Sequence, residues 1–177
     1  MSMIYNLLRV SPSELNSYLE NSDLLFDRIY QSEDEDPAQI DLDKAWDGIH
    51  CLLTGTHLFN SQNEDEDVWY TPFSLIMFPG NDGQLIDKNQ NMGIGFPAHY
   101  QTAEQVTRAA ALLATVNLRD RYQHVGSEAL SQSYPFEIAG QWLESEDLPY
   151  LEYYFEQMQQ FFACAAENGE AVISYIN

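Results

Sequence analysis

The last thirty residues constrain the fold more than any other part of the sequence. Between Asp147 and Asn168, apolar side chains recur every three or four residues, which is the spacing of one face of an α-helix. The residues of this face are Leu151, Phe155, Met158, Phe162 and Ala165. Asn168 and Gly169 are typical of a helix end, and the sequence EAVISYI that follows favours a β-strand. A long C-terminal helix followed by a final strand therefore requires a sheet on which both can pack.

The N-terminal segment predicts a second strand of that sheet. Residues 3–10, MIYNLLRV, are typical of a short buried strand. A helix then begins after Ser11, with Pro12 in its first turn and Glu14 completing a capping box. Residues 22–30 have mixed helical spacing and predict a second short helix.

Two further segments have clear signals. Residues 92–101 predict an extended segment that runs into a helix capped by Thr102 and Gln105. Residues 40–55, IDLDKAWDGIHCLLTG, predict a helix that Gly55 ends in a left-handed conformation.

The middle of the chain has no sustained period. Residues 74–78 favour neither a strand nor a helical turn, and residues 119–147 predict one or two short helices that break at Tyr134 and Pro135. A chain of 177 residues with 45% apolar side chains is the size of one domain. We therefore predict a single α+β domain over residues 1–177, with a small mixed or antiparallel sheet of about three to five strands covered by several helices.

The net charge of the chain indicates which kinds of molecule it can bind. The chain has 28 acidic and 7 basic residues, a formal net charge of -21. Such a charge repels nucleic acid and anionic membranes, and it attracts basic proteins. Acidity that serves only solubility remains the simpler explanation. The N-terminus lacks the pattern of a signal peptide and no apolar run is long enough for a membrane helix, so a cytoplasmic location is expected.

The segment 40–55 holds the strongest candidate for chemistry. On a helix, Asp43, Asp47 and His50 form one stripe beside Trp46, on the flank of the apolar face. Cys51 points to the opposite side of such a helix. Cys51 and Cys164 have no CxxC spacing, which favours two reduced structural thiols.

Three interpretations of this stripe remain open. Asp47 can orient His50 as a general base or as a ligand-binding group in a cleft. The three side chains can bind a divalent metal together with His57. In the third and simplest interpretation, Asp43 or Asp41 caps the helix and His50 is hydrogen-bonded at the edge of the core.

No other motif indicates a cofactor. GIGFP at residues 93–97 lacks the third glycine of a dinucleotide-binding loop, and the consecutive acids of NEDED at residues 63–67 do not match a calcium loop. We expect neither a cofactor nor a bound metal.

A contact surface for another protein is also predicted. Three tyrosines of the last helix lie outside its core face, and two loops are strongly acidic. The candidate contact residues are Tyr150, Tyr153, Tyr154, Glu33, Asp34, Glu64 and Asp65.

The sequence also resembles a known family. The segment LDKAWDGIHCLLTGT at residues 42–56, followed by Phe59, resembles the signature of the YfbM-like bacterial proteins, whose function is not established. MSMIYNLLRVSPSEL, GIGFPAHYQTAEQV, YPFEIAGQW and the C-terminal helix and strand are similar to other parts of that family. The resemblance implies one cytoplasmic α+β domain, and it assigns no catalytic role because none is established for the family. The motif positions are Asp43, Lys44, Trp46, Asp47, His50, Leu53, Thr54 and Gly55.

Two functions follow from these observations. The first is a non-enzymatic protein-binding module, in one version an immunity or antitoxin-like protein that binds a basic protein through carboxylates and tyrosines. The alternative is an enzyme or small-ligand-binding protein that uses Asp47 and His50 in a cleft beside Trp46.

Overall fold

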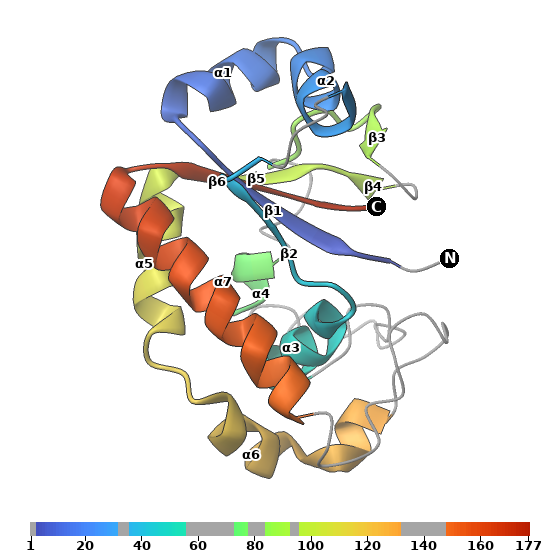
Figure 1. The fold of residues 1–177 in the computed structure, drawn as a ribbon, viewed down its shortest axis with the longest axis vertical. Helices are drawn as coiled ribbons and strands as arrows, with labels where there is room; N and C mark the ends of the chain where they lie inside the picture. Colours follow the sequence, from blue (N-terminus) through green and yellow to red (C-terminus); the bar gives the residue numbers. More distant parts are fainter. Residues whose placement is uncertain (1–2, 32–35, 56–72, 78–83, 93–95, 132–147) are drawn as a thin grey trace.

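A four-stranded antiparallel sheet in the order β2-β1-β6-β5 runs through the middle of the protein (Figure 1). The computed structural model describes residues 3–31, 36–55, 73–77, 84–92, 96–131 and 148–177. The strands of this sheet are β1 (Tyr5–Val10), β2 (Gln39–Asp41), β5 (His99–Gln101) and β6 (Ala171–Ile176). A separate two-stranded ribbon consists of β3 (Asn91–Met92) and β4 (Phe96–Pro97).

The first and last strands are neighbours at the centre of the sheet. They pair from Tyr5 with Ile176 to Val10 with Ala171. Beyond this ladder, the amide of Ile4 donates to the carbonyl of Asn177 at 2.9 Å, and the Asn177 amide donates to the Ile4 carbonyl at 3.1 Å. The two ends of the described chain therefore lie side by side.

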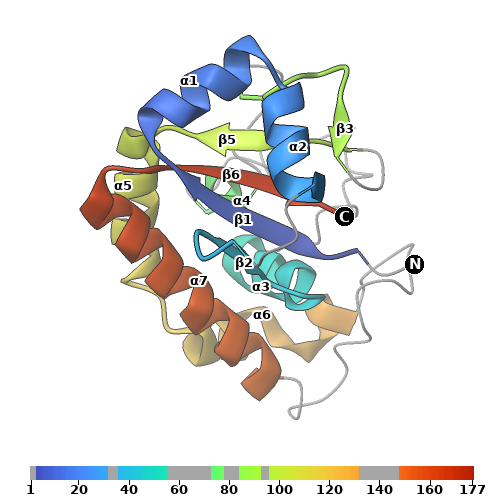
Figure 2. The same cartoon turned by 45° about the horizontal axis from the view of Figure 1, so that its top comes forward.

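Helices cover both faces of the sheet. The helices are α1 (Pro12–Glu20), α2 (Asp23–Gln31), α3 (Ala45–Thr54), α4 (Ser74–Met77), α5 (Ala103–Leu113), α6 (Leu118–Ser131) and α7 (Leu148–Asn168). Helices α1 and α2 lie on one face, and α3, α5 and α7 lie on the other (Figures 1 and 2). None of the described helices combines the length and apolar character needed to cross a membrane.

Successive side chains of the central strands point to opposite faces of the sheet, so the protein has two hydrophobic cores. Leu7 and Val172 belong to a large core with α3, α5 and α7, whereas Leu8 and Ile173 belong to a smaller core with α1 and α2. All six residues of β6 are buried. Because both faces of the sheet are covered, most residues of the central strands are buried, as predicted for residues 3–10.

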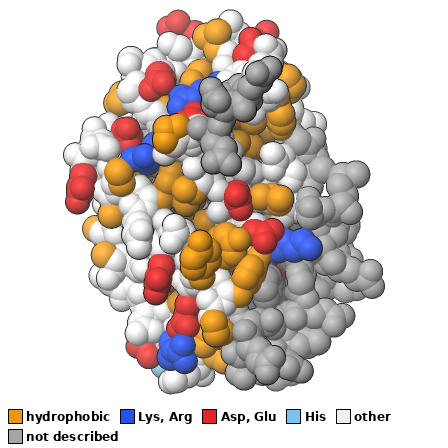
Figure 3. All heavy atoms as spheres, in the orientation of Figure 1, with side chains coloured by type: hydrophobic (Ala, Val, Ile, Leu, Met, Phe, Trp, Pro, Cys, Tyr) orange, Lys and Arg blue, Asp and Glu red, His pale blue; other side chains and the backbone are white. Residues whose placement is uncertain are grey.

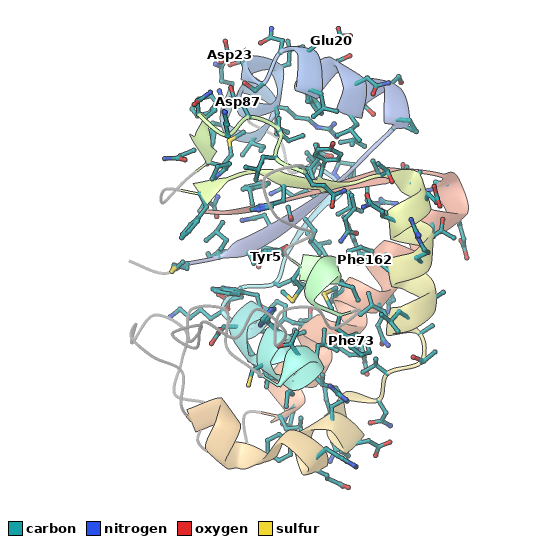
Figure 4. The ribbon with its side chains drawn as sticks, turned by 180° about the vertical axis from the view of Figure 1, so that it is seen from behind. Tyr5, Glu20, Asp23, Phe73, Asp87 and Phe162 are labelled. Atoms are coloured by element: carbon teal, nitrogen blue, oxygen red, sulfur yellow. The ribbon has the colours of Figure 1, made fainter. Side chains whose placement is uncertain are left out.

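The larger core contains aromatic and polar side chains together. Figure 4 shows Tyr5 on the same side of the sheet as Phe162 of α7. Burial raises the pKa of the Tyr5 hydroxyl, and a hydrogen bond with Ser174 opposes this rise. The Gln101 side chain donates to the carbonyl of Ile76 at 2.7 Å, which fastens α4 to β5.

Local signals at the helix ends are confirmed. The Glu14 amide donates to Ser11 Oγ at 3.2 Å, and the Ser11 amide donates to the Glu14 carboxylate at 2.7 Å. Thr102 and Gln105 form the same reciprocal pair at the start of α5. Gly55 ends α3 with a φ of 86°. These residues satisfy backbone groups that a helix end leaves without partners.

The prediction of one helix over residues 40–55 is wrong in its first part. Gln39–Asp41 pairs with β1 as the edge strand β2, so the helix begins only at Ala45. Tertiary pairing with β1 overrides the helical periodicity of this segment.

The structure assigns the segments whose sequence left the secondary structure open. Residues 74–77 form the helical turn α4, and the described residues of the segment 92–101, except Ala98, belong to β3, β4 and β5. Residues 118–131 form one helix, α6. The predicted break at Tyr134 and Pro135 lies outside the described residues.

Candidate functional site

Helix α3 is enclosed on all sides. Every residue from Ala45 to Leu53 is buried, because the helix contacts α4, α6 and α7. The expected division into an inward face and an outward flank is therefore wrong for this helix. Cys51, predicted to point away from the stripe, is also buried. Both cysteines are free thiols.

Trp46 joins α3 to the beginning of the chain. Its indole Nε1 donates to the carbonyl of Met3 at 3.0 Å, and its ring stacks on Tyr5 with 6.2 Å between centroids. The side chain is 1% exposed. Trp46 thus has a clear packing role, in which its polar atom is satisfied by the backbone.

Asp47 and His50 lie within the same buried helix. They are 3% and 2% exposed. The hydroxyl of Thr54 lies 3.5 Å from His50 Nδ1 and donates to the His50 carbonyl at 2.8 Å. Thr54 lies four residues after His50, which is the spacing of one helical turn, and this spacing is the sequence signal for their contact. A substrate for these groups would have to enter a closely packed part of the protein.

Asp43 does not belong to the helical stripe. It precedes α3 with a φ of 44°, and among the described non-glycine residues no other has a positive φ. Aspartate tolerates this left-handed conformation better than most residues. The α3 N-terminus has no side-chain cap, so the prediction that Asp43 or Asp41 caps it is wrong. The Asp41 carboxylate instead accepts the amide of Asp43 at 3.0 Å, which stabilises the turn from β2 to α3.

The Asp43 side chain meets the tyrosines of α7. The hydroxyl of Tyr150 donates to Asp43 Oδ2 at 2.8 Å. The rings of Tyr150 and Tyr154 pack edge to face at 4.9 Å, and those of Tyr153 and Tyr154 at 5.1 Å. Two groups of candidates that are far apart in the sequence therefore form one surface. We call Asp41, Asp43, Tyr150, Tyr153 and Tyr154 the tyrosine–aspartate face.

The tyrosine–aspartate face is accessible and negatively charged. Tyr153 is 58% exposed, Asp41 is exposed, and the other three side chains are half-buried. Figure 3 shows hydrophobic and acidic side chains together where α7 passes β2 and α3. Burial raises the pKa of Tyr150, and its hydrogen bond to Asp43 raises it further. Burial and the charges of Asp43 and Asp41 also raise the pKa of Tyr154.

Among the described ion pairs, none joins an arginine to Asp41 or Asp43, although the exposed Lys44 directly follows Asp43 in the chain. Four of the five arginines form ion pairs with carboxylates: Arg9 with Glu170, Arg28 with Glu14 and Asp36, Arg108 with Glu104, and Arg119 with Glu152. The fifth, Arg121, donates to the carbonyls of Leu52 and Leu53 at the end of α3, at 2.9 and 2.6 Å. The arginines are therefore engaged with other carboxylates or with the end of α3, and the Arg108 pair is exposed on the surface of α5.

The other candidate contact residues, and the candidate metal ligand His57, lie outside the part of the chain that the structure describes. These contact residues are Glu33, Asp34, Glu64 and Asp65. Within the parts that are described, no group of three His, Cys, Asp or Glu residues is arranged to hold a metal ion. Asp23 and Asp87 lie at the same end of the molecule in Figure 4, where they accept hydrogen bonds from Gln90 and Ser22.

Comparison with known proteins places the chain in a family. The family model for a domain of unknown function, DUF1877, matches residues 1–175. Among solved structures, the chain is similar to the crystal structure of YfbM from Escherichia coli, a protein of unknown function. The two share 15% sequence identity with a TM-score of 0.70, over 98% of this chain and 99% of that chain. No curated protein matches the sequence. The resemblance to YfbM-like proteins is thus confirmed, and the chain belongs to the DUF1877 family.

Proposed function

We propose that the protein is a non-enzymatic module that binds a basic protein, with the tyrosine–aspartate face as part of its binding surface. The observation that carries this proposal is the contact of Tyr150 with Asp43, because it joins aromatic and carboxylate groups on one accessible face. Tyrosine is enriched among the residues that dominate binding energy at protein interfaces. The neighbouring carboxylates supply charge complementarity to a basic partner.

The charge of the whole chain supports the same partner class. A net charge of -21 attracts a basic protein over a distance and accelerates its association. One concrete version is an immunity or antitoxin-like role, in which the acidic surface covers the active surface of a basic toxin. In this version, a gene for a basic protein lies beside the gene for this chain.

The enzyme or small-ligand alternative has less support. Trp46, Asp47 and His50 are all at most 3% exposed, and Trp46 already binds the backbone of Met3. Buried titratable groups occur in structural networks as well as in functional sites, so their burial alone does not indicate catalysis. We therefore assign these three residues to packing.

A binding experiment tests the protein-binding role. The purified chain is titrated with each basic protein encoded next to its gene, at about 50 mM and about 300 mM salt. We expect binding that weakens strongly at the higher salt concentration. If none of these neighbours binds at low salt, or if binding is unaffected by salt, the proposal is wrong. If the protein shows enzymatic activity and the His50→Ala variant loses it, the enzyme hypothesis would be favoured instead.

A further inference from the structure

We infer that the tyrosine–aspartate face receives an arginine side chain of the partner protein. This inference rests on the proposed function and specifies the chemical group that the face recognises. It depends on the arrangement of three tyrosine rings beside two carboxylates, which together suit a flat cationic group.

The rings offer the aromatic half of such a site. Tyr153 is 58% exposed and packs with its ring edge-to-face against Tyr154, which packs in the same way against Tyr150. A cation is attracted to the face of an aromatic ring within about 6 Å of its centre. The side chains of Tyr153 and Tyr154 therefore form an accessible surface on which a guanidinium group can stack.

Arginine side chains already stack on aromatic rings within the protein. Arg9 lies over the ring of Phe161 at 5.5 Å, and Arg121 lies over Phe73 at 5.6 Å. Within the described parts of the chain, no such arginine lies over Tyr153 or Tyr154. These two rings are thus available to a cation from another molecule.

The aspartates offer the acidic half of the site. Asp43 Oδ2 accepts the Tyr150 hydroxyl at 2.8 Å, and Asp41 Oδ1 accepts the Asp43 amide at 3.0 Å. An ionised carboxylate has about four positions for hydrogen bonds, so both groups retain capacity for a donor. Tyr150 and the turn fix their orientation before a partner arrives, which reduces the entropy that binding must overcome. The effect of both charges on the pKa of Tyr154 is consistent with their closeness to the rings.

Arginine fits this combination better than lysine. A guanidinium group is planar, stacks on aromatic rings and donates two parallel hydrogen bonds to carboxylates, whereas an ammonium group is compact and more strongly hydrated. We therefore expect a preference for arginine at equal charge.

The test uses a short, end-blocked Gly-Ser peptide that contains two arginines and a matched peptide that contains two lysines. Binding to the full chain is followed by NMR at about 50 mM salt. We expect amide signals of residues 41–44 and 150–154 to shift with the arginine peptide. The arginine peptide is expected to bind about threefold or more tightly than the lysine peptide.

Matched variants separate this site from diffuse charge attraction. Asp43→Asn and Tyr153→Leu are each expected to weaken binding of the arginine peptide about threefold to fivefold. Glu167→Gln removes the same charge near the far end of α7, about 20 Å away along the helix. Tyr30→Leu removes another exposed tyrosine, on α2. Both controls are expected to change binding less than about twofold.

The outcomes distinguish the inference from the proposed function. Equal weakening by Asp43→Asn and Glu167→Gln, equal affinity for the two peptides, or shifts confined to other residues would overturn the arginine site. Binding of a basic neighbour protein could still be salt-dependent in that case, and the proposed function would stand. If the arginine peptide binds as expected but no basic neighbour binds, the site is supported and the protein-binding role fails.

Discussion

The hydroxyl of Tyr150 donates to the carboxylate of Asp43 at 2.8 Å, although the two residues are 107 positions apart. This bond connects the first turn of α7 with the turn that precedes α3. Asp43 is held there in a left-handed conformation with a φ of 44°. The contact therefore stabilises a strained residue and orients its charge toward the tyrosine rings.

We expect Tyr150→Phe to lower the free energy of unfolding by about 1 kcal/mol, because a half-buried carboxylate loses one donor. Urea denaturation measures this change. Tyr153→Phe is the control, because no hydrogen bond of its hydroxyl occurs among the described residues, and its effect is expected to stay below about 0.5 kcal/mol. Equal effects of the two variants would show that the bond to Asp43 contributes nothing.

The sequence predicts each end of this bond but not the bond itself. Asp43 stands in the segment with the clearest family signature, and Tyr150 lies outside the apolar face of α7, so both are candidates for function. Their meeting depends on β2, a three-residue edge strand that pairs with β1 and delays the start of α3. Three residues are too few for periodicity to reveal a strand, and the pairing is a tertiary effect.

The helix ends and the central strands are more predictable for a physical reason. The Ser11 and Thr102 caps depend on contacts three residues away, and β1 and β6 place apolar residues in the cores on both faces of the sheet. The full burial of α3 is less predictable. It results from the packing of α4, α6 and α7 against this helix, and no pattern within the helix specifies those neighbours.

The packing role of Trp46 and His50 has a direct consequence for stability. We expect Trp46→Phe to lower the free energy of unfolding by about 2 kcal/mol, because the bond to the Met3 carbonyl is lost and a cavity forms. His50→Ala is expected to have a similar effect, since a buried ring is removed.

Binding of the arginine peptide should remain within about twofold of wild type in both variants, if they are measured where each is folded. Thermal unfolding and the NMR titration together check this pair of outcomes. A His50 variant that loses binding while it keeps its stability would contradict the packing role.

Gly169 ends α7 and turns the chain into β6. Its φ is 66°, the amide of Glu170 donates to the Ala165 carbonyl at 2.9 Å, and a Cβ at Gly169 would meet nothing within 4 Å. The cost of a side chain is therefore conformational. We expect Gly169→Ala to lower the unfolding free energy by about 1 kcal/mol, and Gly169→Asn to lower it less. Chemical denaturation of the two variants checks this order, and the reverse order would argue against the left-handed cap.

His99 is expected to titrate below the ordinary histidine value. Burial lowers its pKa from 6.5, and a hydrogen bond with the backbone of Pro97 only partly opposes this. The folded state therefore binds its proton less tightly than the unfolded state does. The stability that this difference contributes is present above pH 6.5 and is lost as the pH falls through the folded pKa. NMR titration of the ring signals checks the pKa, with His99→Gln to identify the resonance; a pKa above 6.5 would contradict the prediction.

Arg28 is the residue through which acid should weaken the packing of α1 and α2. Its guanidinium donates to Asp36 at 2.8 Å and to Glu14 at 3.1 Å. Hydrogen bonds from Ser11 and the charge of Arg28 hold the pKa of Glu14 below 4.5, although burial opposes them. Burial also acts to raise the pKa of Asp36, but the bonds from Arg28 and the Ala38 amide outweigh it and lower the pKa.

Both carboxylates therefore stabilise the fold above pH values of about 4 to 5, and this contribution is lost as the pH falls through their folded pKa values. We expect Arg28→Gln to lower the unfolding free energy by about 1 kcal/mol at neutral pH and to have a smaller effect near pH 3. Arg108→Gln removes the same charge from an exposed pair with Glu104, in which the two side chains are 70% and 83% exposed, so it should have almost no effect at either pH. Urea unfolding of both variants at the two pH values measures the difference. An Arg28 effect that stays constant with pH, or one matched by Arg108→Gln, would show that these ion pairs do not account for the acid sensitivity.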